Sequence, residues 1–369
     1  MKREKNTQET YAPRHLKKET VMVEETGKQS EINRPLCILL MILGMTAYGE
    51  ERVDTLTYAV YPYLPDPAYY QELIELRWHE VEPDIQLIRA EWDCYKDGVP
   101  EGVDVVMYDA VMLDTIAAAG WIQPIDPNAV QNLGDIFPFA LEGLAIDGKM
   151  YGIPVFLCGN LLIYDQDCEA LAAAEHITDL AGMSEILVIN SESPVNRKQY
   201  LIEVIADARG EANPSVDGVN EDALRLIDCL AIHAHKHDDD TQVVMAYDSG
   251  VGGGYIGFSE SMRLLKNRAG KTRIKSISFS DQPDTTRMYV DAVAVTVNAE
   301  GQRYEKSLEL MNVMAEADVL TKLSVQDSAP QYLFLARRIP YQQLSKLFPL
   351  YSQMEELAGE GNNRAILTP

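Results

Sequence analysis

The stretch GIPVFLCGNLLIYD, residues 152–165, is a long extended apolar run with Cys158, Gly159 and Asn160 near its centre. Apolar runs of this kind form buried strands, and this one is long enough to cross from one lobe of a two-lobed protein to the other. A buried cysteine is usually an inert small hydrophobic residue. The stretch therefore raises the question of whether Cys158 only fills a strand or is a nucleophile at the bottom of a cleft.

Strand and helix patterns alternate on the N-terminal side of this stretch. Extended segments begin at Asp54, Asp84 and Val103, and helical spacing of apolar residues occupies 68–82 and the stretch up to Ala119. An Asp-Gly pair at 147–148 predicts a hairpin turn just before the crossing stretch. Such alternation predicts an α/β protein with a largely parallel sheet.

A second series of elements follows from about Ile163. Strands are predicted at EILVIN (185–190) and QVVMAY (242–247), and helices at 196–210 and 221–236. The apolar run RMYVDAVAVTVN, 287–298, is interpreted as a second crossing between lobes. Helical patterns from Lys306 to Leu357 finish the chain.

This order predicts two lobes, two crossings and a C-terminal helical segment. We expect lobe 1 at 51–155 plus about 292–335, lobe 2 at 156–290, and a helical segment packed across the lobes at 336–369. Ahead of them, 1–34 is polar and is expected to be a disordered leader. Residues 35–49 resemble a signal peptide, with Arg34 before an apolar core and small residues at Ala47-Tyr48-Gly49. We expect a secreted or periplasmic protein without stable membrane association after leader removal; an apolar turn of a cytoplasmic domain is the alternative.

Composition and charge narrow the classes of partner. The chain has 369 residues, a formal net charge of −25 and a pI of about 4.6. Such a surface repels nucleic acid and anionic membranes, and it suits a cationic small ligand, although acidity also serves solubility alone. The five cysteines include no CxxC pair, so zinc ribbons and thioredoxin motifs are unsupported.

Aromatic and acidic residues lie where predicted strands end. This set comprises Tyr61, Tyr63, Tyr95, Asp109, Tyr289 and Asp291. Each aromatic ring alone is more often packing than a ligand contact. Together the residues would form a box for a flat cationic heterocycle, because aromatic faces attract cations and carboxylates bind an aminopyrimidine edge in two places.

A glycine-rich stretch, YDSGVGGGYIGFSESM, runs from Tyr247 to Met262. No GKS or GKT follows it, so a P-loop is unsupported. We expect a loop that leads into a helix capped by Ser259. Glu260 is then either a surface acid that complements the helix dipole or a general base that faces Cys158.

Three histidines alternate in HAHKHDDD, 233–240, at the end of a helical pattern. Their position at solvent makes this a compositional signal only. We predict neither a metal site nor a cofactor.

The stretches EWDCY, DGKMYGIPVFLCGNLLIY, GGYIGFSESM and YVDAV together resemble the bacterial thiaminase I (thiamine pyridinylase) family. The resemblance spans roughly 54–293 and implies a type II periplasmic-binding-protein fold, which sugar-binding proteins also have. It implies that Cys158 is the nucleophile and Glu260 the base that activates it. It also places Tyr61, Tyr63, Tyr95, Asp109, Tyr289 and Asp291 in the substrate pocket, with Tyr247 as a further candidate. Phe258 stands where the family pattern has tyrosine.

The resemblance implies a transferase. Cys158 would attack the pyrimidine of thiamine and expel the thiazole, and an amine, thiol, pyridine or water would take the pyrimidinylmethyl group. We expect a monomer that binds thiamine and this nucleophilic co-substrate. The alternative is an exported solute-binding protein for thiamine or a similar cationic heterocycle, which would release its ligand intact; an inactive relative is a third hypothesis.

Overall fold

The computed structural model describes residues 52–190, 221–237, 239–277 and 286–363, all within one compact unit, Glu51–Pro369. The leader predicted at 1–34, the signal-like segment at 35–49 and the helix predicted at 196–210 lie outside the described residues. Within them, none of the helices is both long and apolar enough to cross a membrane.

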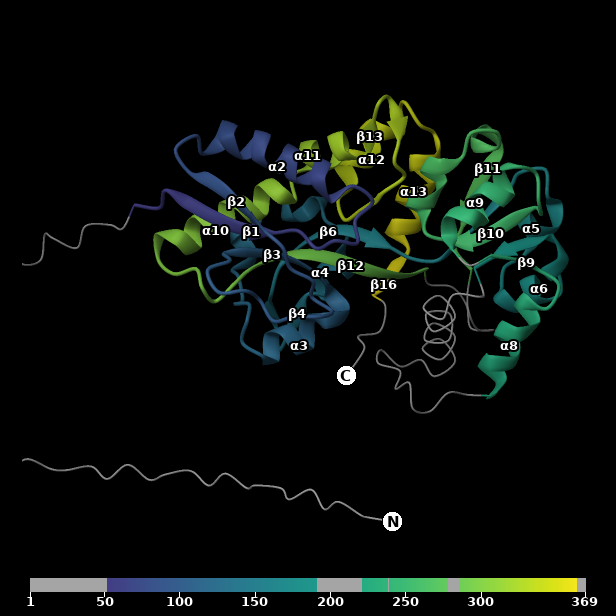
Figure 1. Ribbon diagram of the computed structural model, residues 1–369, viewed down its shortest axis with the longest axis horizontal. Helices are drawn as coiled ribbons and strands as arrows, with labels where there is room; N and C mark the ends of the chain where they lie inside the picture. Colours follow the sequence, from purple (N-terminus) through teal and green to yellow (C-terminus); the bar gives the residue numbers. More distant parts are fainter. Residues whose placement is uncertain (1–51, 191–220, 238, 278–285, 364–369) are drawn as a thin grey trace, which may run out of the picture. The chain divides into compact units, whose positions relative to one another are not determined.

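The first sheet has the strand order β15-β6-β12-β3-β1-β2, with β16 paired to β12 (Figure 1). Its strands are β1 (Thr55–Ala59), β2 (Gln86–Ala90), β3 (Val105–Asp109), β6 (Ile153–Cys158), β12 (Thr286–Val295), β15 (Phe334–Leu335) and β16 (Gly361–Asn363). The pairs β1–β2, β1–β3 and β12–β16 are parallel, whereas β12 is antiparallel to β3 and β6.

The second sheet has the order β11-β7-β10-β8-β9. Its strands are β7 (Leu161–Asp165), β8 (Leu187–Ile189), β9 (His235–Lys236), β10 (Gly254–Gly257) and β11 (Thr272–Lys275). It also mixes parallel and antiparallel pairs. The largely parallel sheet predicted from the sequence is therefore wrong, because β7 is antiparallel to β10 and β11, and β12 is antiparallel to β3 and β6.

The prediction for 152–165 as a crossing is confirmed. β6 belongs to the first sheet and β7 to the second, and only Gly159 and Asn160 separate them. The run at 287–298 differs: β12 pairs only with first-sheet strands among the described residues. The chain is therefore already in the first sheet at Thr286, where β12 begins.

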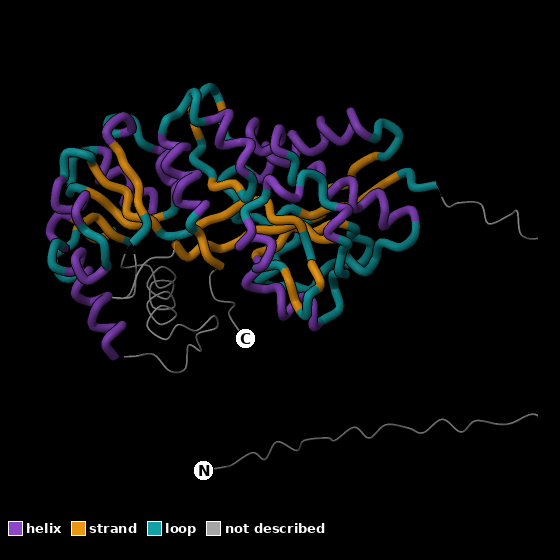
Figure 2. Tube along the Cα trace, turned by 180° about the vertical axis from the view of Figure 1, so that it is seen from behind, coloured by secondary structure: helices purple, strands orange, loops and turns teal. Residues whose placement is uncertain are grey.

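Helices cover the two sheets. In Figure 1, α2 and α11 lie on one side of the first sheet and α3 and α4 on the other. The helices of the described chain are α2 (Pro67–Val81), α3 (Leu113–Ala118), α4 (Pro138–Glu142), α5 (Glu169–Ala173), α6 (Ile177–Ala181), α8 (Glu221–Ala231), α9 (Asp240–Asp248), α10 (Gln302–Met314), α11 (Ala317–Leu323), α12 (Arg338–Leu344) and α13 (Leu350–Gly359). The tube in Figure 2 shows the same layers from behind.

Local sequence signals explain the elements next to the site. Asp66 accepts a hydrogen bond from the backbone N–H of Tyr69 at 3.0 Å and so caps α2, while Pro67 occupies its first turn. The hairpin β4 (Ala145–Ile146) to β5 (Lys149–Met150) turns at 147–148, where both residues have positive φ, as a type I′ turn requires.

Two further sequence predictions are wrong. QVVMAY is not a strand but part of α9, because Asp239 accepts from the N–H of Gln242 at 2.8 Å and starts a helix there. Its valines and Tyr247 then bury one face of that helix. The glycine-rich stretch is not wholly a loop, because Gly254–Gly257 forms β10.

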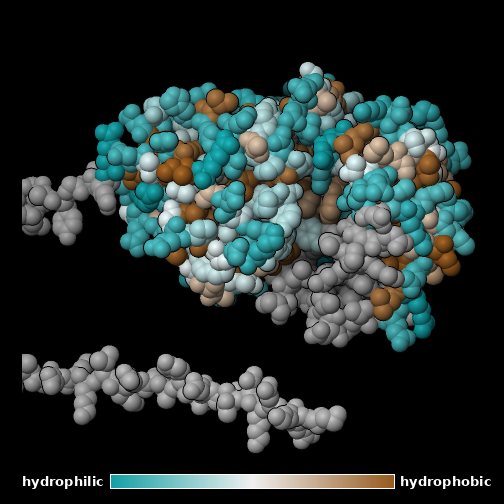
Figure 3. All heavy atoms as spheres, in the orientation of Figure 1, coloured by the Kyte–Doolittle hydropathy of each residue, from teal (hydrophilic) through white to brown (hydrophobic). Residues whose placement is uncertain are grey.

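The C-terminal part is helical only in places. Between α11 and α12 lie the short strands β13 (Val325–Gln326), β14 (Ala329–Pro330) and β15. The face drawn in Figure 3 is largely hydrophilic with scattered hydrophobic residues, as expected for an acidic protein whose apolar residues form the core.

Candidate active site

Four strand ends and one strand start meet at one edge of the first sheet. β1 is parallel to β2 and β3, and β6 has the direction of β3 because both are antiparallel to β12. The carboxyl ends of β1, β2, β3 and β6 therefore lie at the edge where β12 begins. Loops at such an edge are where α/β folds bind ligands.

Three tyrosine–carboxylate hydrogen bonds organise this edge. The hydroxyl of Tyr61 donates to Oδ1 of Asp291 at 2.6 Å, and that of Tyr63 donates to Oδ2 of Asp93 at 2.9 Å. The hydroxyl of Tyr95 donates to Asp109. Hydrogen bonds to an ionised acceptor are stronger than neutral ones, so these pairs fix the three rings. We call these residues the tyrosine–aspartate cluster.

The rings of the cluster touch one another. The centroids of Tyr61 and Tyr63 are 5.7 Å apart, and those of Tyr63 and Tyr95 are 5.6 Å apart with an edge-to-face orientation. Tyr61 is buried, whereas Tyr63 and Tyr95 are 54% and 47% exposed. The cluster thus offers solvent a row of aromatic surface backed by carboxylates, a setting suited to a flat cationic ring.

Asp109 and Asp291 are buried and directly opposite each other on β3 and β12. Burial, and then the neighbouring charge of Asp109, raises the pKa of Asp291 well above its ordinary value, although the Tyr61 hydroxyl opposes this. Both carboxyl oxygens of Asp109 accept hydrogen bonds. The backbone N–H of Val111 donates to Oδ1 at 2.9 Å, and the hydroxyl of Tyr95 donates to Oδ2.

Cys158 ends β6 beside this cluster. It pairs with Tyr289 across β12, and its charge contributes to the raised pKa of Tyr61, after burial and Asp291. A Cβ on Gly159 would lie 2.6 Å from the carbonyl oxygen of Arg287, so only glycine lets the chain pass this close to β12. The thiol is only partly buried.

A second cysteine, Cys94, lies at the same edge in a different environment. It is buried, and burial together with the charges of Asp109 and Asp291 raises the pKa of its thiol to about 12. Such a cysteine stays protonated and inert. Cys94 therefore packs behind the cluster.

Glu260 lies on the 3-10 helix η6, Ser259–Leu264, that follows β10 of the second sheet. Burial raises the pKa of Glu260 to about 7, with the charge of Asp240 adding to the rise and its own backbone N–H and Arg263 opposing it. Its charge also contributes to the raised pKa of Asp291, so the two carboxyl groups are electrostatic neighbours. A carboxyl with this pKa exchanges protons near neutral pH.

The predicted capping role of Ser259 is wrong. Phe258 takes the cap position, and Ser259 is the first residue of η6. The hydroxyl of Ser259 instead donates to the carbonyl oxygen of Tyr332 at 2.6 Å. Tyr332 itself has a left-handed backbone, with a φ of 52°.

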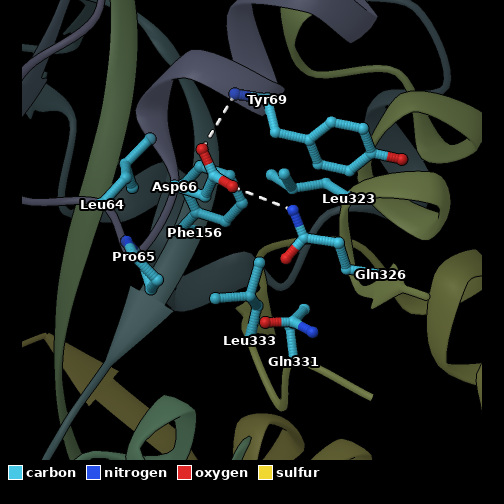
Figure 4. A pocket seen from close by; sticks show the side chains of 9 residues that line it. All are labelled: Leu64, Pro65, Asp66, Tyr69, Phe156, Leu323, Gln326, Gln331 and Leu333. Atoms are coloured by element: carbon cyan, nitrogen blue, oxygen red, sulfur yellow. Dashed lines mark hydrogen bonds between the residues drawn. The ribbon is translucent and has the colours of Figure 1, made fainter. Parts of the chain in front are cut away.

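Residues 325–335, which we call the connecting segment, touch all three parts of the site. Gln326 donates to Oδ2 of Asp66 at 2.9 Å, and Asp66 directly follows the loop that carries Tyr61 and Tyr63. Gln326 and Asp66 both line a pocket of about 10 Å³ (Figure 4). Tyr332 accepts from Ser259, next to Glu260. Phe334 pairs with Leu157, next to Cys158. The connecting segment therefore fixes the tyrosine loop, the cysteine and the glutamate relative to one another.

The predicted site residues divide into those the structure gathers and those it does not. Tyr61, Tyr63, Tyr95, Asp109, Cys158, Tyr289 and Asp291 share the first-sheet edge, and Phe258 and Glu260 follow β10. Tyr247 is fully buried on α9, where its ring contacts Tyr255 and its hydroxyl bonds to Thr272. Sequence reasoning gave no role to Asp93 as the partner of Tyr63, and Tyr332 carries no local sequence signal.

In the described ranges, no group of three or more His, Cys, Asp or Glu residues is placed to hold a metal ion. The three alternating histidines are at a short strand, β9, whose His235 is exposed.

The chain has relatives among known proteins. The chain is 30% identical over 365 residues to Thiaminase-1 of Paenibacillus thiaminolyticus, an alignment that covers 90% of this chain and 89% of that protein. No protein-family model matches the chain. The structure of Clostridium botulinum thiaminase I in complex with thiamin is 28% identical, with a TM-score of 0.78 over 85% of this chain and 94% of that chain.

A sugar-binding protein shares the fold alone. Maltose-bound T. maritima MalE3 has a TM-score of 0.65 at 14% identity, covering 85% of this chain and 90% of that chain. This likeness confirms the predicted binding-protein fold.

Proposed function

The chain belongs to the thiaminase I family, and we propose that it degrades thiamine as a transferase with Cys158 as nucleophile and Glu260 as base. The observation that carries the proposal is the partly buried thiol of Cys158 beside the tyrosine–aspartate cluster, with a carboxyl of pKa about 7 held nearby by the connecting segment.

The tyrosine–aspartate cluster binds the aminopyrimidine in this proposal. The rings of Tyr61, Tyr63 and Tyr95 offer faces for stacking. The carboxyls of Asp109 and Asp291 face the amine and ring nitrogens, where they favour the protonated pyrimidine and make it a better electron acceptor. Tyr289 lies across from Cys158 and so flanks the reacting carbon. Tyr247 has no part in this arrangement because its ring is enclosed in the core.

Glu260 takes the thiol proton of Cys158, because a nearby carboxylate opposes a thiolate unless it accepts that proton directly. The thiolate sulfur forms a bond to the pyrimidine ring. The bond between the methylene carbon and the thiazolium nitrogen then breaks, and its electron pair leaves with the neutral thiazole. A second nucleophile bonds to the methylene carbon, and the electron pair of the carbon–sulfur bond returns to Cys158.

Export and quaternary state belong to the same proposal. The apolar run within 35–49 supports a secreted or periplasmic enzyme. We expect it to act as a monomer on thiamine and a small nucleophile, since both halves of the site come from one chain.

The test is intact-protein mass spectrometry on the full chain with thiamine, together with measurement of released thiazole. We expect a pyrimidinylmethyl adduct and thiazole release from the wild type, and neither from Cys158→Ala. Cys229→Ala is the matched control because Cys229 is exposed and carries a free thiol. Unchanged thiamine bound by both the wild type and Cys158→Ala would instead establish the solute-binding alternative.

A further inference from the structure

Asp93 holds a positive charge at the outer side of the tyrosine–aspartate cluster. Nζ of Lys96 lies 2.7 Å from Oδ2 of Asp93, the same oxygen that accepts from the hydroxyl of Tyr63 at 2.9 Å. The ammonium group also lies over the Tyr63 ring, 6.0 Å from its centroid. A carboxylate and an aromatic face together form a site for a cation, and the side chain of Lys96 occupies it.

The two partners of this ion pair are held very differently. Asp93 is only 8% exposed, and its Oδ1 accepts from the backbone N–H of Tyr95 at 3.1 Å. Burial alone would raise the pKa of Asp93, but its donors outweigh burial and hold the pKa below its ordinary value. The side chain of Lys96 is 67% exposed. Water screens its charge and its flexible chain loses entropy in the pair, so Lys96 can leave easily while the carboxylate stays in place.

The cation site lies one aromatic ring away from the reaction centre. The centroid of the Tyr63 ring is 5.7 Å from that of Tyr61. Tyr61 in turn donates to Asp291 at 2.6 Å, and the charge of Cys158 contributes to its raised pKa after burial and Asp291. Thiamine consists of two rings joined by one methylene carbon. A pyrimidine ring at Tyr61 and Asp291 therefore brings the positively charged thiazolium ring within reach of Tyr63.

We propose that Asp93 and the Tyr63 ring bind the thiazolium ring, and that Lys96 is an exchangeable counterion which the substrate displaces and which returns after the reaction. This inference rests on the proposed function, because it assigns residues to the second ring of that substrate. When the bond between the methylene carbon and the thiazolium nitrogen breaks, the electron pair stays on the nitrogen and the thiazole is neutral. A neutral ring does not compensate the charge of Asp93, so Lys96 returns to the carboxylate and the thiazole leaves.

Asp93 also shapes the turn that follows β2. Its backbone carbonyl accepts from the N–H groups of Lys96 at 3.0 Å and Asp97 at 3.1 Å. A substitution that only disturbs this turn weakens every ligand alike. A lost charge instead acts on charged ligands alone, so the ratio of two affinities separates a binding role of Asp93 from a structural one.

The first test compares a charged and a neutral ligand on Cys158→Ala protein by calorimetric titration. The ligands are thiamine and its deaza analogue, in which carbon replaces the charged nitrogen of the second ring. Asp93→Asn keeps an oxygen for the Tyr95 N–H but removes the charge. We expect the ratio of the Kd of the analogue to the Kd of thiamine to fall about fivefold. Asp97→Asn is the matched control, because it removes an exposed charge from the same turn and should leave the ratio unchanged. An unchanged ratio in Asp93→Asn would make Asp93 a structural residue and overturn the proposal.

The second test removes the counterion instead. Lys96→Met, added to Cys158→Ala, leaves the carboxylate of Asp93 without a competing cation, so the Kd values of both ligands should fall about threefold. Lys96→Arg retains the positive charge, and it should restore the values of the Cys158→Ala protein. Unchanged Kd values in Lys96→Met would exclude the exchange. Neither test requires turnover: if both give the expected result but the wild type releases no thiazole, the cation site stands and the proposed transferase reaction fails.

Discussion

The acids at the two sides of the site differ in the groups that donate hydrogen bonds to them. Asp93, Asp109 and Asp291, at the first-sheet edge, each accept a hydrogen bond from a tyrosine hydroxyl. Glu260, beside the second sheet, accepts from its own backbone N–H, and burial raises its pKa to about 7. The difference teaches a division of labour: acids with fixed donors orient a ligand, whereas an acid with a pKa near neutrality can move a proton.

The largest expected effect comes from removing the proton carrier. Glu260→Gln keeps the size and shape of the side chain but cannot take the thiol proton, so kcat should fall about 10²- to 10⁴-fold. Steady-state kinetics with thiamine measures the loss, and Glu185→Gln, at an exposed acid, is the control. If Glu260→Gln keeps a kcat within threefold of the wild type, Glu260 does not carry the proton, and it does not differ in role from the acids of the first-sheet edge.

Glu260→Gln should be more stable than the wild type at alkaline pH. The folded-state pKa of Glu260, about 7, lies above its ordinary value of 4.5, so the folded protein binds more protons between these pH values and its free energy of unfolding falls as pH rises through that window. Above pH 7, Glu260→Gln should therefore exceed the wild type by about 1–3 kcal/mol in urea unfolding, and below pH 4 the difference should vanish. A loss of stability at pH 8 would mean that Glu260 is structural.

The pH dependence of turnover sharpens the contrast further. Because only ionised Glu260 accepts the thiol proton, kcat/KM should fall about tenfold for each pH unit below its pKa, which is about 7. The reaction measured from pH 5 to pH 8 checks this. A flat profile across the range would contradict a proton-transfer role for Glu260.

Substitutions on the first-sheet side should have smaller effects, and these should appear in the KM for thiamine. Tyr61→Phe removes the hydroxyl that donates to buried Asp291 at 2.6 Å and should raise the KM for thiamine about tenfold, since a buried acceptor left without its donor costs about 1–3 kcal/mol. Tyr63→Phe removes a bond from an exposed ring to Asp93, which keeps an ion pair with Lys96 at 2.7 Å. Its KM should change less than threefold, and equal effects of the two variants would show that burial does not rank these pairs.

Much of the first-sheet side could be predicted because its signals are local. Apolar runs mark β1, β3 and β6, and the polar residue that ends each run marks the edge. Tyr61 and Asp109 follow from this rule alone, whereas Cys158 lies within one continuous apolar run and its role came from the family resemblance. The two cysteines show its limit: the sequence gives no reason why Cys94 is buried with a pKa of about 12 while Cys158 is only partly buried.

The second-sheet side was predicted less well because tertiary contacts determine it. The β-branched run in QVVMAY favours a strand, but the Asp239 cap and the burial of one face make it a helix. The partner of Ser259 is Tyr332, 73 residues away, and no periodicity reports a contact at that distance. The family resemblance assigned the role of base to Glu260. The hydrogen bond from Ser259 to Tyr332, which anchors the helix of Glu260, has no signal in the sequence.

That anchor gives a small expected effect on kcat, which is also the most specific. Ser259→Ala breaks the bond between η6 and the connecting segment, and we expect kcat to fall about fivefold, equivalent to about 1 kcal/mol, with the KM for thiamine unchanged. A looser η6 admits water to Glu260, and because burial raises the pKa of this group, the midpoint of the pH profile should move toward acid.

Ser261→Ala is the matched control for Ser259→Ala. The hydroxyl of Ser261 donates to the carbonyl of Phe258 at 2.6 Å, within the same turn, so it does not tie η6 to the connecting segment. Its pH midpoint should stay at the wild-type value. If Ser259→Ala lowers kcat but leaves the midpoint in place, the serine contributes only stability. If the midpoint moves in Ser259→Ala alone, the connecting segment tunes the proton carrier, and the two sides of the site are coupled through the backbone that pairs with β6.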